Sequence, residues 1–285
     1  MGRSVRAFVA VALALGGVLV GVFGAPLNAS AAPRRRPPPR PPAPVPTWTV
    51  DRVRVESVGA AASVVGVGTY PGVLDVVPAA AGAPRGLAVV NEVGFEEYVA
   101  GISEVPSEWP IEALKAQAVA ARTYALTTTK SGAGFEHYPD TRSQVYGGVD
   151  AEHPASDEAI AATRRQVLRY DGEPAFTQFG SSSGGWTSAG SVPYLPAQAD
   201  PYDGWSGNPN HDWSEKVTDA RFESAWPGLG NLKRIVVPSR DGNGDWGGRV
   251  TTLRLVGSKA TITVSGDTMR SVLGLRSTWV TFRVR

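Results

Sequence analysis

Alternating apolar and polar positions dominate the chain between Val50 and Val93. Such alternation is typical of strands that bury one face, and glycines and prolines break it into separate runs. We expect strands over residues 50–59, 63–70, 72–77 and 86–93. This part of the chain offers no cluster of titratable side chains that would indicate chemistry, so we interpret it as a β-rich entry module.

The pattern becomes helical after these strands. A short helix is expected from Phe95 to Ile102, followed by an acidic turn over residues 103–108. Pro110 then stands where a long helix can begin, because the missing N–H of proline costs nothing at the first helical position. This helix should run to about Thr128. Its apolar face consists of Leu114, Ala118, Ala121 and Ala125, and its polar positions are Lys115, Gln117 and Arg122.

The rest of the chain mixes both kinds of element. One helix fits Asp157–Gln166 with Ser156 as its cap, and another lies near Thr268–Leu273 and ends at Gly274. Strands are expected over 167–170, 174–179, 232–238, 249–256, 260–264 and 279–284. Because strand runs and helices do not strictly alternate, the pattern predicts an α+β fold with mixed or antiparallel strands and a central alanine-rich helix.

The first 32 residues have the order of an export signal. Arg3 and Arg6 precede an apolar run over residues 7–24, and the small residues at 29–32 suit signal-peptidase cleavage. An uncleaved membrane anchor is the alternative, since the apolar run is close to the length that spans a bilayer. Residues 33–47 form a disordered linker rich in proline and arginine, and we assign residues 48–285 to one domain.

Charge is distributed unevenly between this tail and the body. The chain has a net charge of +2, and its first 50 residues contain six arginines and no acid, so the remainder carries −4. A basic tail beside an acidic body predicts contact with anionic lipid or wall polymers, although a soluble spacer has the same composition. Nucleic acid is not an expected partner of an exported acidic domain. The chain contains no cysteine, which excludes disulfides and a lipoprotein anchor.

Several segments carry a family resemblance. They are EALKAQAVAARTYAL from Glu112, SQVYGG from Ser143, FGSSSGGWTSAGSVPYLPAQADPYD from Phe179, HDWSEKVT from His211 and GDTMRSVLGLRSTWVTFRV from Gly266. In this order, together with the acidic turn before the first of them, they resemble the SpoIID/LytB family, the sporulation stage II protein D and amidase-enhancer proteins of bacterial cell walls. The resemblance covers roughly residues 48–285.

The resemblance implies a function on peptidoglycan. Family members similar to the sporulation protein cleave glycan strands as lytic transglycosylases, and Glu104, before Val105 and Pro106, occupies the position of their proposed acid/base. We therefore expect an exported, wall-associated lytic transglycosylase without a cofactor. The alternative is a non-catalytic enhancer of a partner N-acetylmuramoyl-L-alanine amidase, as implied by the amidase-enhancer members. A purely structural wall binder is a third possibility.

A single carboxyl group can perform the expected reaction. It protonates the departing glycosidic oxygen and then takes the proton of the sugar's own 6-hydroxyl group, whose oxygen attacks the anomeric carbon. Because this nucleophile is tethered, no water has to be bound. Alternatively, Glu104 could serve only to hold the turn, by accepting hydrogen bonds from backbone N–H groups. Glu108 and Glu112 are weaker candidates, and Glu112 is the weaker of the two, since an acid in the first helical turn is expected for the dipole alone.

A small polar loop is the second candidate region. It consists of Ser181, Ser182, Ser183, Gly184 and Gly185, and we expect it to line the sugar groove, because short side chains let a sugar approach backbone donors. The loop also fits G-x-S-x-G, with Ser182, Asp203 and His211 in the order of a hydrolase triad. That motif needs a helix directly after the serine, and the glycines here disfavour one.

Three other residues are candidates for sugar binding. Gln144 and Tyr146 could hydrogen-bond a sugar or only anchor their loop, and His137 could shape the groove or be an ordinary loop histidine. We predict no metal there, because the thiolate zinc site of some relatives needs cysteine. Aromatic residues are dense in one loop-rich region, where they could stack on sugars or fill the core: Trp186, Tyr194, Tyr202, Trp205 and Trp213.

The segment DGNGDWGG, from Asp241, resembles the start of a calcium loop. Asp241, Asn243 and Asp245 are spaced as in an EF-hand, but Trp246 stands where that loop needs glycine. A glycine-rich hairpin turn is therefore the better interpretation.

Overall fold

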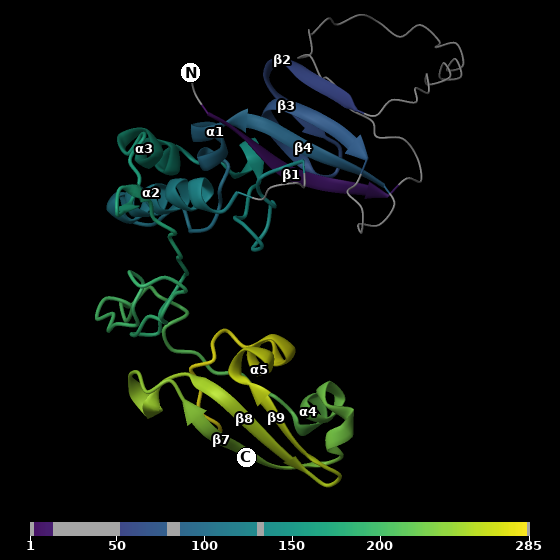
Figure 1. The fold of residues 1–285 in the computed structure, drawn as a ribbon, viewed down its shortest axis with the longest axis vertical. Helices are drawn as coiled ribbons and strands as arrows, with labels where there is room; N and C mark the ends of the chain where they lie inside the picture. The colour runs from purple at the N-terminus through teal and green to yellow at the C-terminus, as the bar shows by residue number, and fades with distance from the viewer. Residues whose placement is uncertain (1–2, 14–51, 79–85, 130–133, 284–285) are drawn as a thin grey trace, which may run out of the picture. The chain divides into compact units, whose positions relative to one another are not determined.

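The computed structural model describes residues 3–13, 52–78, 86–129 and 134–283 (Figure 1). The chain divides into two compact units, Met1–Thr177 and Gln178–Arg285. This boundary falls inside the stretch that the sequence assigns to one domain. The linker expected over residues 33–47, and residues 14–32 of the expected export signal, lie outside the described residues.

The first unit is built on a four-stranded antiparallel sheet. Its strands are β1 (Ser4–Leu13), β2 (Val53–Val64), β3 (Gly68–Pro78) and β4 (Gly86–Gly94), in the spatial order β1-β4-β3-β2 (Figure 1). The sequence predicts four strands between residues 50 and 93, but the structure has three there: the expected strand over residues 63–70 is divided by the turn at residues 65–67, which joins β2 to β3. The sheet buries an apolar face that includes Leu74, Val89 and Val93.

Strand β1 occupies the segment that the sequence identifies as the start of an export signal. It pairs with β4 in register from Ser4 opposite Gly94, and Val5 and Ala7 are fully buried. Arg6 Nη2 lies 3.0 Å from the carboxylate of Asp75, which is itself fully buried in β3. The described part of the segment is therefore an edge strand in this structure. Its removal by a signal peptidase stays a prediction.

The chain after β4 forms helices. They are α1 (Phe95–Ala100), α2 (Ile111–Thr127) and α3 (Pro154–Ala162), and α2 lies beside α3 (Figure 1). The alanine-rich helix is confirmed, with Pro110 directly before it as its N-cap. The expected apolar face is buried at Leu114, Ala118, Ala121 and Ala125.

Helix α3 begins earlier than the sequence pattern indicates. Its N-cap is His153, not Ser156, and His153 Nδ1 accepts a hydrogen bond from the N–H of Ala155 at 3.3 Å. Pro154 follows at the first helical position, where its fixed φ suits the helix. The helix ends at Ala162, and Arg165 has a positive φ of 65°. The expectation of a helix over Asp157–Gln166 is thus shifted toward the N-terminus.

Arg122 joins the helices of the first unit. Its side chain is 1% exposed, although the sequence suggests only a polar position on α2. Nη2 lies 2.9 Å from Glu96 Oε2 in α1, and Nη1 donates to the carbonyl of Gln166, beyond α3, at 3.2 Å. One guanidinium group therefore ties α1, α2 and the chain after α3 together.

The second unit contains a three-stranded antiparallel sheet. Its strands are β7 (Leu232–Arg240), β8 (Val250–Gly257) and β9 (Thr261–Ser265), and its helices are α4 (Asp219–Ala225) and α5 (Gly266–Leu273). The core includes Phe222, Leu253, Leu255 and Met269. Gly274 caps α5 in the left-handed conformation, at φ 72°, as the sequence predicts.

Some expectations for this region differ from the structure. Residues 279–283 form no strand, and α4 is not evident from the sequence pattern. The expected strands around residues 167–179 shrink to the two-residue pair β5 (Arg169–Tyr170) and β6 (Glu173–Pro174). Short 3-10 helices complete the elements, namely η1 (Gly148–Ala151), η2 (Pro227–Leu229) and η3 (Asp245–Gly247). Across the described ranges, no helix has the length and apolarity that crossing a membrane requires.

Replacing Arg122 by Met should destabilise the first unit by about 3 kcal/mol or more, because Glu96 and buried carbonyl groups lose their partner. Chemical denaturation of the purified variant measures the loss. The matched control is Arg142→Met, which breaks an exposed pair with Asp140 and should cost less than about 1 kcal/mol. Equal losses of unfolding free energy in the two variants would contradict the conclusion that Arg122 holds α1, α2 and the chain after α3 together.

A chain that begins at residue 33 should be less stable than the full chain. It lacks β1, so β4 loses its backbone partner on one edge and Asp75 loses Arg6. Thermal unfolding of both chains, followed by circular dichroism, compares them. An unchanged melting temperature would mean that β1 adds nothing to the folded unit, which is the result expected of a segment that serves only for export.

Candidate functional site

Glu104 lies directly after a short pairing between two loops of the first unit. Ser103 N donates to the carbonyl of Val145 at 3.0 Å, and Gly147 N donates to the carbonyl of Gly101 at 2.9 Å. Glu104 Oε1 then accepts a hydrogen bond from the N–H of Val145 at 2.7 Å. The half-buried carboxylate is therefore held in place through one oxygen.

This geometry fits both interpretations of Glu104. Its bond to Val145 does hold the turn, and Oε2 takes part in no hydrogen bond among the described residues. The two weaker candidates differ from it. Glu108 and Glu112 are exposed, and Glu112 forms an ion pair with Lys115 at 2.7 Å, which is the ordinary helix-surface role.

The other candidates of the first unit are buried. His137 and Gln144 are fully buried, and Tyr146 is 3% exposed. The Tyr146 hydroxyl group donates to Asn91 Oδ1 at 2.7 Å, and Gln144 Nε2 donates to the carbonyl of Ala121 at 3.3 Å. Direct sugar binding by these side chains stays a prediction. In this structure they anchor the loop whose Val145 N–H holds Glu104.

His137 packs against an aromatic cluster. Its ring stacks on Tyr98 with centroids 5.2 Å apart, and the centroids of Tyr98 and Tyr146 are 4.9 Å apart. Burial raises the pKa of Tyr98 far above its usual value, and the nearby phenol of Tyr146 and the charge of Glu104 add smaller effects. Tyr98 therefore stays neutral in this cluster.

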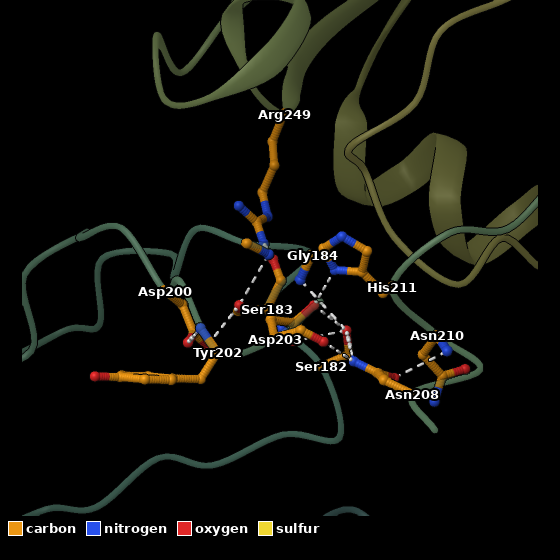
Figure 2. Close-up of polar contacts among 11 residues, drawn as sticks. Ser182, Ser183, Gly184, Asp200, Tyr202, Asp203, Asn208, Asn210, His211 and Arg249 are labelled. Atoms are coloured by element: carbon orange, nitrogen blue, oxygen red, sulfur yellow. Dashed lines mark hydrogen bonds and ion pairs between the residues drawn. The ribbon is translucent and has the colours of Figure 1, made fainter. Parts of the chain in front are cut away.

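The serine-rich loop belongs to the second unit, where Asp203 is its centre (Figure 2). Ser182 Oγ donates to the two carboxylate oxygens at 2.9 and 3.0 Å, and the N–H of Ser183 donates to Oδ1 at 2.6 Å. His211 Nδ1 lies 2.6 Å from Oδ2. Asn208 Nδ2 donates to the carbonyl of Asp203 at 2.8 Å. One buried carboxylate thus organises the whole loop.

Two further contacts fix Ser183. Its hydroxyl group donates to Asp200 Oδ2 at 2.8 Å, and its carbonyl accepts from Arg249 Nη2 at 2.6 Å (Figure 2). Gly184 and Gly185 follow with positive φ angles of 73° and 100°. Both sides of the loop are therefore tied to the second unit, which leaves it little freedom to rearrange.

The loop does not form a nucleophile elbow. No helix follows Ser182, and its hydroxyl group is directed at Asp203, whereas a hydrolase serine bonds to the histidine. His211 forms its own hydrogen bond with the Asp203 carboxylate, between Nδ1 and Oδ2. The cluster is a hydrogen-bonded support with Asp203 at its centre. The eight-residue spacing of Asp203 and His211 is present in the sequence, but nothing in it indicates that both serve one loop.

The electrostatics of this pair follow from its geometry. The hydrogen bond to Asp203 and the charge of that carboxylate raise the pKa of His211 above 6.5. Burial acts to raise the pKa of Asp203, but the hydrogen bonds from His211, Ser183 and Ser182 outweigh it, so that this pKa is lowered. The folded state therefore favours the charged pair.

The glycine-rich segment from Asp241 is a hairpin, as the sequence predicts. It connects β7 to β8, and Asp241 Oδ1 accepts hydrogen bonds from the N–H groups of Asn243 and Arg249 at 3.1 and 2.9 Å. This carboxylate therefore closes its own turn. Within the described ranges, no group of three or more His, Cys, Asp or Glu side chains is arranged to hold a metal ion.

Comparison with known proteins shows a family match over part of the chain. Residues 84–170 match the family model SpoIID, described as Stage II sporulation protein. The amidase enhancer of Bacillus subtilis is 42% identical over 114 residues, which cover 36% of this chain and 15% of that relative. The Stage II sporulation protein D of the same organism is 31% identical over 161 residues, which cover 47% of this chain and 46% of the relative.

An uncharacterized protein of Brachyspira hyodysenteriae is 39% identical over 120 residues, covering 38% of this chain and 33% of the relative. The chain spans less than half the length of each of these relatives. The matches identify residues 84–170 as a region of the SpoIID/LytB family. The matched segment includes Glu104 and the whole of helix α2.

Protonated His211 should stabilise the second unit below pH 6.5, and this contribution should disappear as pH rises through the higher pKa of the folded state. The pKa of Asp203 is lowered in the folded state, so the stability that ionised Asp203 contributes is lost only as the pH falls through that pKa. The variant His211→Asn keeps a neutral donor but cannot be protonated. Unfolding measured from pH 5 to 9 should show a loss toward alkaline pH in the wild type only. Parallel curves for the two proteins would contradict the charged pair.

Proposed function

We propose that the chain acts on bacterial peptidoglycan as a lytic transglycosylase, with Glu104 as the acid/base. The observation that carries the proposal is the carboxylate of Glu104, which lies in the family-matched segment and is held by Val145 N–H at 2.7 Å. A fixed carboxyl group with one oxygen engaged leaves the other for proton transfer. The expected location is outside the cell, in association with the wall.

The reaction needs only this group and the substrate. Protonated Oε2 gives its proton to the glycosidic oxygen as the bond from that oxygen to the anomeric carbon breaks. The resulting carboxylate, stabilised by the N–H of Val145, then takes the proton of the 6-hydroxyl group while its oxygen bonds to the anomeric carbon. The products are a free 4-hydroxyl end and a 1,6-anhydro end, so no water is consumed.

A second function is favoured by one observation. The relative named amidase enhancer has the higher identity of the two named Bacillus relatives, 42% against 31%. In this alternative the chain binds the wall and increases the activity of a separate N-acetylmuramoyl-L-alanine amidase, and Glu104 serves only to hold its turn.

The variant Glu104→Gln should form 1,6-anhydro products at least about a hundredfold more slowly than the wild type, because it lacks the transferable proton. Glutamine keeps an acceptor for Val145 N–H, so the fold should be unchanged. Mass spectrometry of glycan strands without peptide stems, incubated with each purified protein, measures the products. Glu112→Gln is the matched control, because this exposed acid pairs only with Lys115, and it should retain full activity.

The same assay separates the two functions. Anhydro ends from the wild type, lost in Glu104→Gln, support the transglycosylase. If the wild type gives no products but increases the turnover of a wall amidase, and Glu104→Gln does so equally, then the enhancer is correct and the acid/base role is wrong.

A further inference from the structure

Gln144 is a fully buried polar residue whose presence the stability of the fold does not explain. Its Nε2 donates to the carbonyl of Ala121 in α2 at 3.3 Å, but its Oε1, which is also buried, accepts no hydrogen bond from the part of the chain that the structure describes. A buried amide with an unpaired oxygen costs free energy that an apolar side chain of the same shape would not cost. An amide at this position therefore needs a reason other than stability.

The neighbouring buried side chain of the same loop differs from Gln144. The Tyr146 hydroxyl group donates to Asn91 Oδ1 at 2.7 Å, and Asn91 Nδ2 donates to the carbonyls of Pro71 and Val73 at 2.7 and 3.2 Å. Both polar atoms of the Asn91 amide group are thus paired, so the burial of this pair is accounted for by the fold. The half-paired amide of Gln144 is not part of that network.

The peptide group between Gln144 and Val145 supplies the N–H that holds Glu104. Val145 N donates to Glu104 Oε1 at 2.7 Å, and the Val145 carbonyl accepts from Ser103 N at 3.0 Å. Any displacement of residue 144 therefore displaces the donor of the carboxylate. The side-chain bond to Ala121 ties residue 144 to α2, which is the helix that follows the turn of Glu104.

We propose that Gln144 is a positioning residue, which fixes the Val145 N–H against the Glu104 carboxylate and does not contact the sugar. The inference rests on the proposed function, in which Glu104 must keep one orientation while its other oxygen transfers a proton. It also assigns Gln144 one of the two roles that the sequence leaves open, since a side chain with no exposed surface reaches no ligand without a rearrangement.

The variant Gln144→Met keeps nearly the shape of the side chain and removes its amide group. In the full chain, kcat for 1,6-anhydro products should fall about tenfold at an unchanged KM, because a displaced reacting group is slow and no sugar contact is lost. The melting temperature should be unchanged or higher, since a buried unpaired oxygen is removed. A residue that only stabilises the fold would give the reverse, which is a lower melting temperature with full activity.

Thr177→Val is the matched control for this variant. Thr177 is 7% exposed, and its hydroxyl group donates to the carbonyl of Ala120 in α2 at 2.8 Å. The control therefore removes a buried side-chain bond to the neighbouring carbonyl of the same helix, from a residue that holds neither Val145 nor Glu104. It should keep the wild-type kcat while its melting temperature falls.

Hydrogen exchange at the Val145 amide tests the positioning without a cleavage assay. Exchange should be about tenfold faster in Gln144→Met than in the wild type, and it should be unchanged in Thr177→Val. Unchanged exchange in Gln144→Met would overturn the inference, and so would a raised KM, which would indicate a sugar contact. If the wild type forms no anhydro products while the Val145 amide responds as expected, the proposed function fails and the positioning of Glu104 stands.

Discussion

The first unit depends on the buried guanidinium group of Arg122. It forms hydrogen bonds with Glu96 in α1 and with the carbonyls of Ile160 in α3 and Gln166 beyond it, while its own backbone belongs to α2. Since the turn with Glu104 is the connection between α1 and α2, its position follows from how these helices are joined. A charge so deeply buried is tolerable only because its donors are used in several directions.

A second set of polar contacts beneath the sheet completes the placement of Glu104. Asn91 in β4 donates to the carbonyl of Pro71 at 2.7 Å and accepts from Tyr146, whose loop also supplies Val145 N–H. The carboxylate is thus linked through backbone and buried side chains to the central strands. In the second unit Asp203 has the corresponding role for the serine-rich loop, again through a buried acceptor that several donors share.

Local chemistry explains which features the sequence could predict. The sequence pattern predicted strands over most of β2, β3 and β4, although not the turn between β2 and β3, and Pro110 and Gly274 marked helix ends, because each depends on neighbours in the chain. The burial of Arg122, His137 and Gln144 could not be predicted, since their partners lie far away in sequence. Strand β1 was missed because an apolar run suits an export signal and a strand equally well. The family resemblance, which rests on motifs, made Glu104 a candidate, but its hydrogen bond to Val145, 41 residues away in sequence, could not be predicted.

The register of the two sheets bears on the order in which the units form. In the second unit the hairpin closes between Arg240 and Val250, so its strands meet over a short stretch of chain. In the first unit Ser4 pairs with Gly94, so β1 can join the sheet only after β4, the last strand of this sheet in the sequence, has been made. Pairing over such separations is slow. The sheet of the first unit therefore cannot close before Gly94 has been synthesised, and β1 has no strand partner until then.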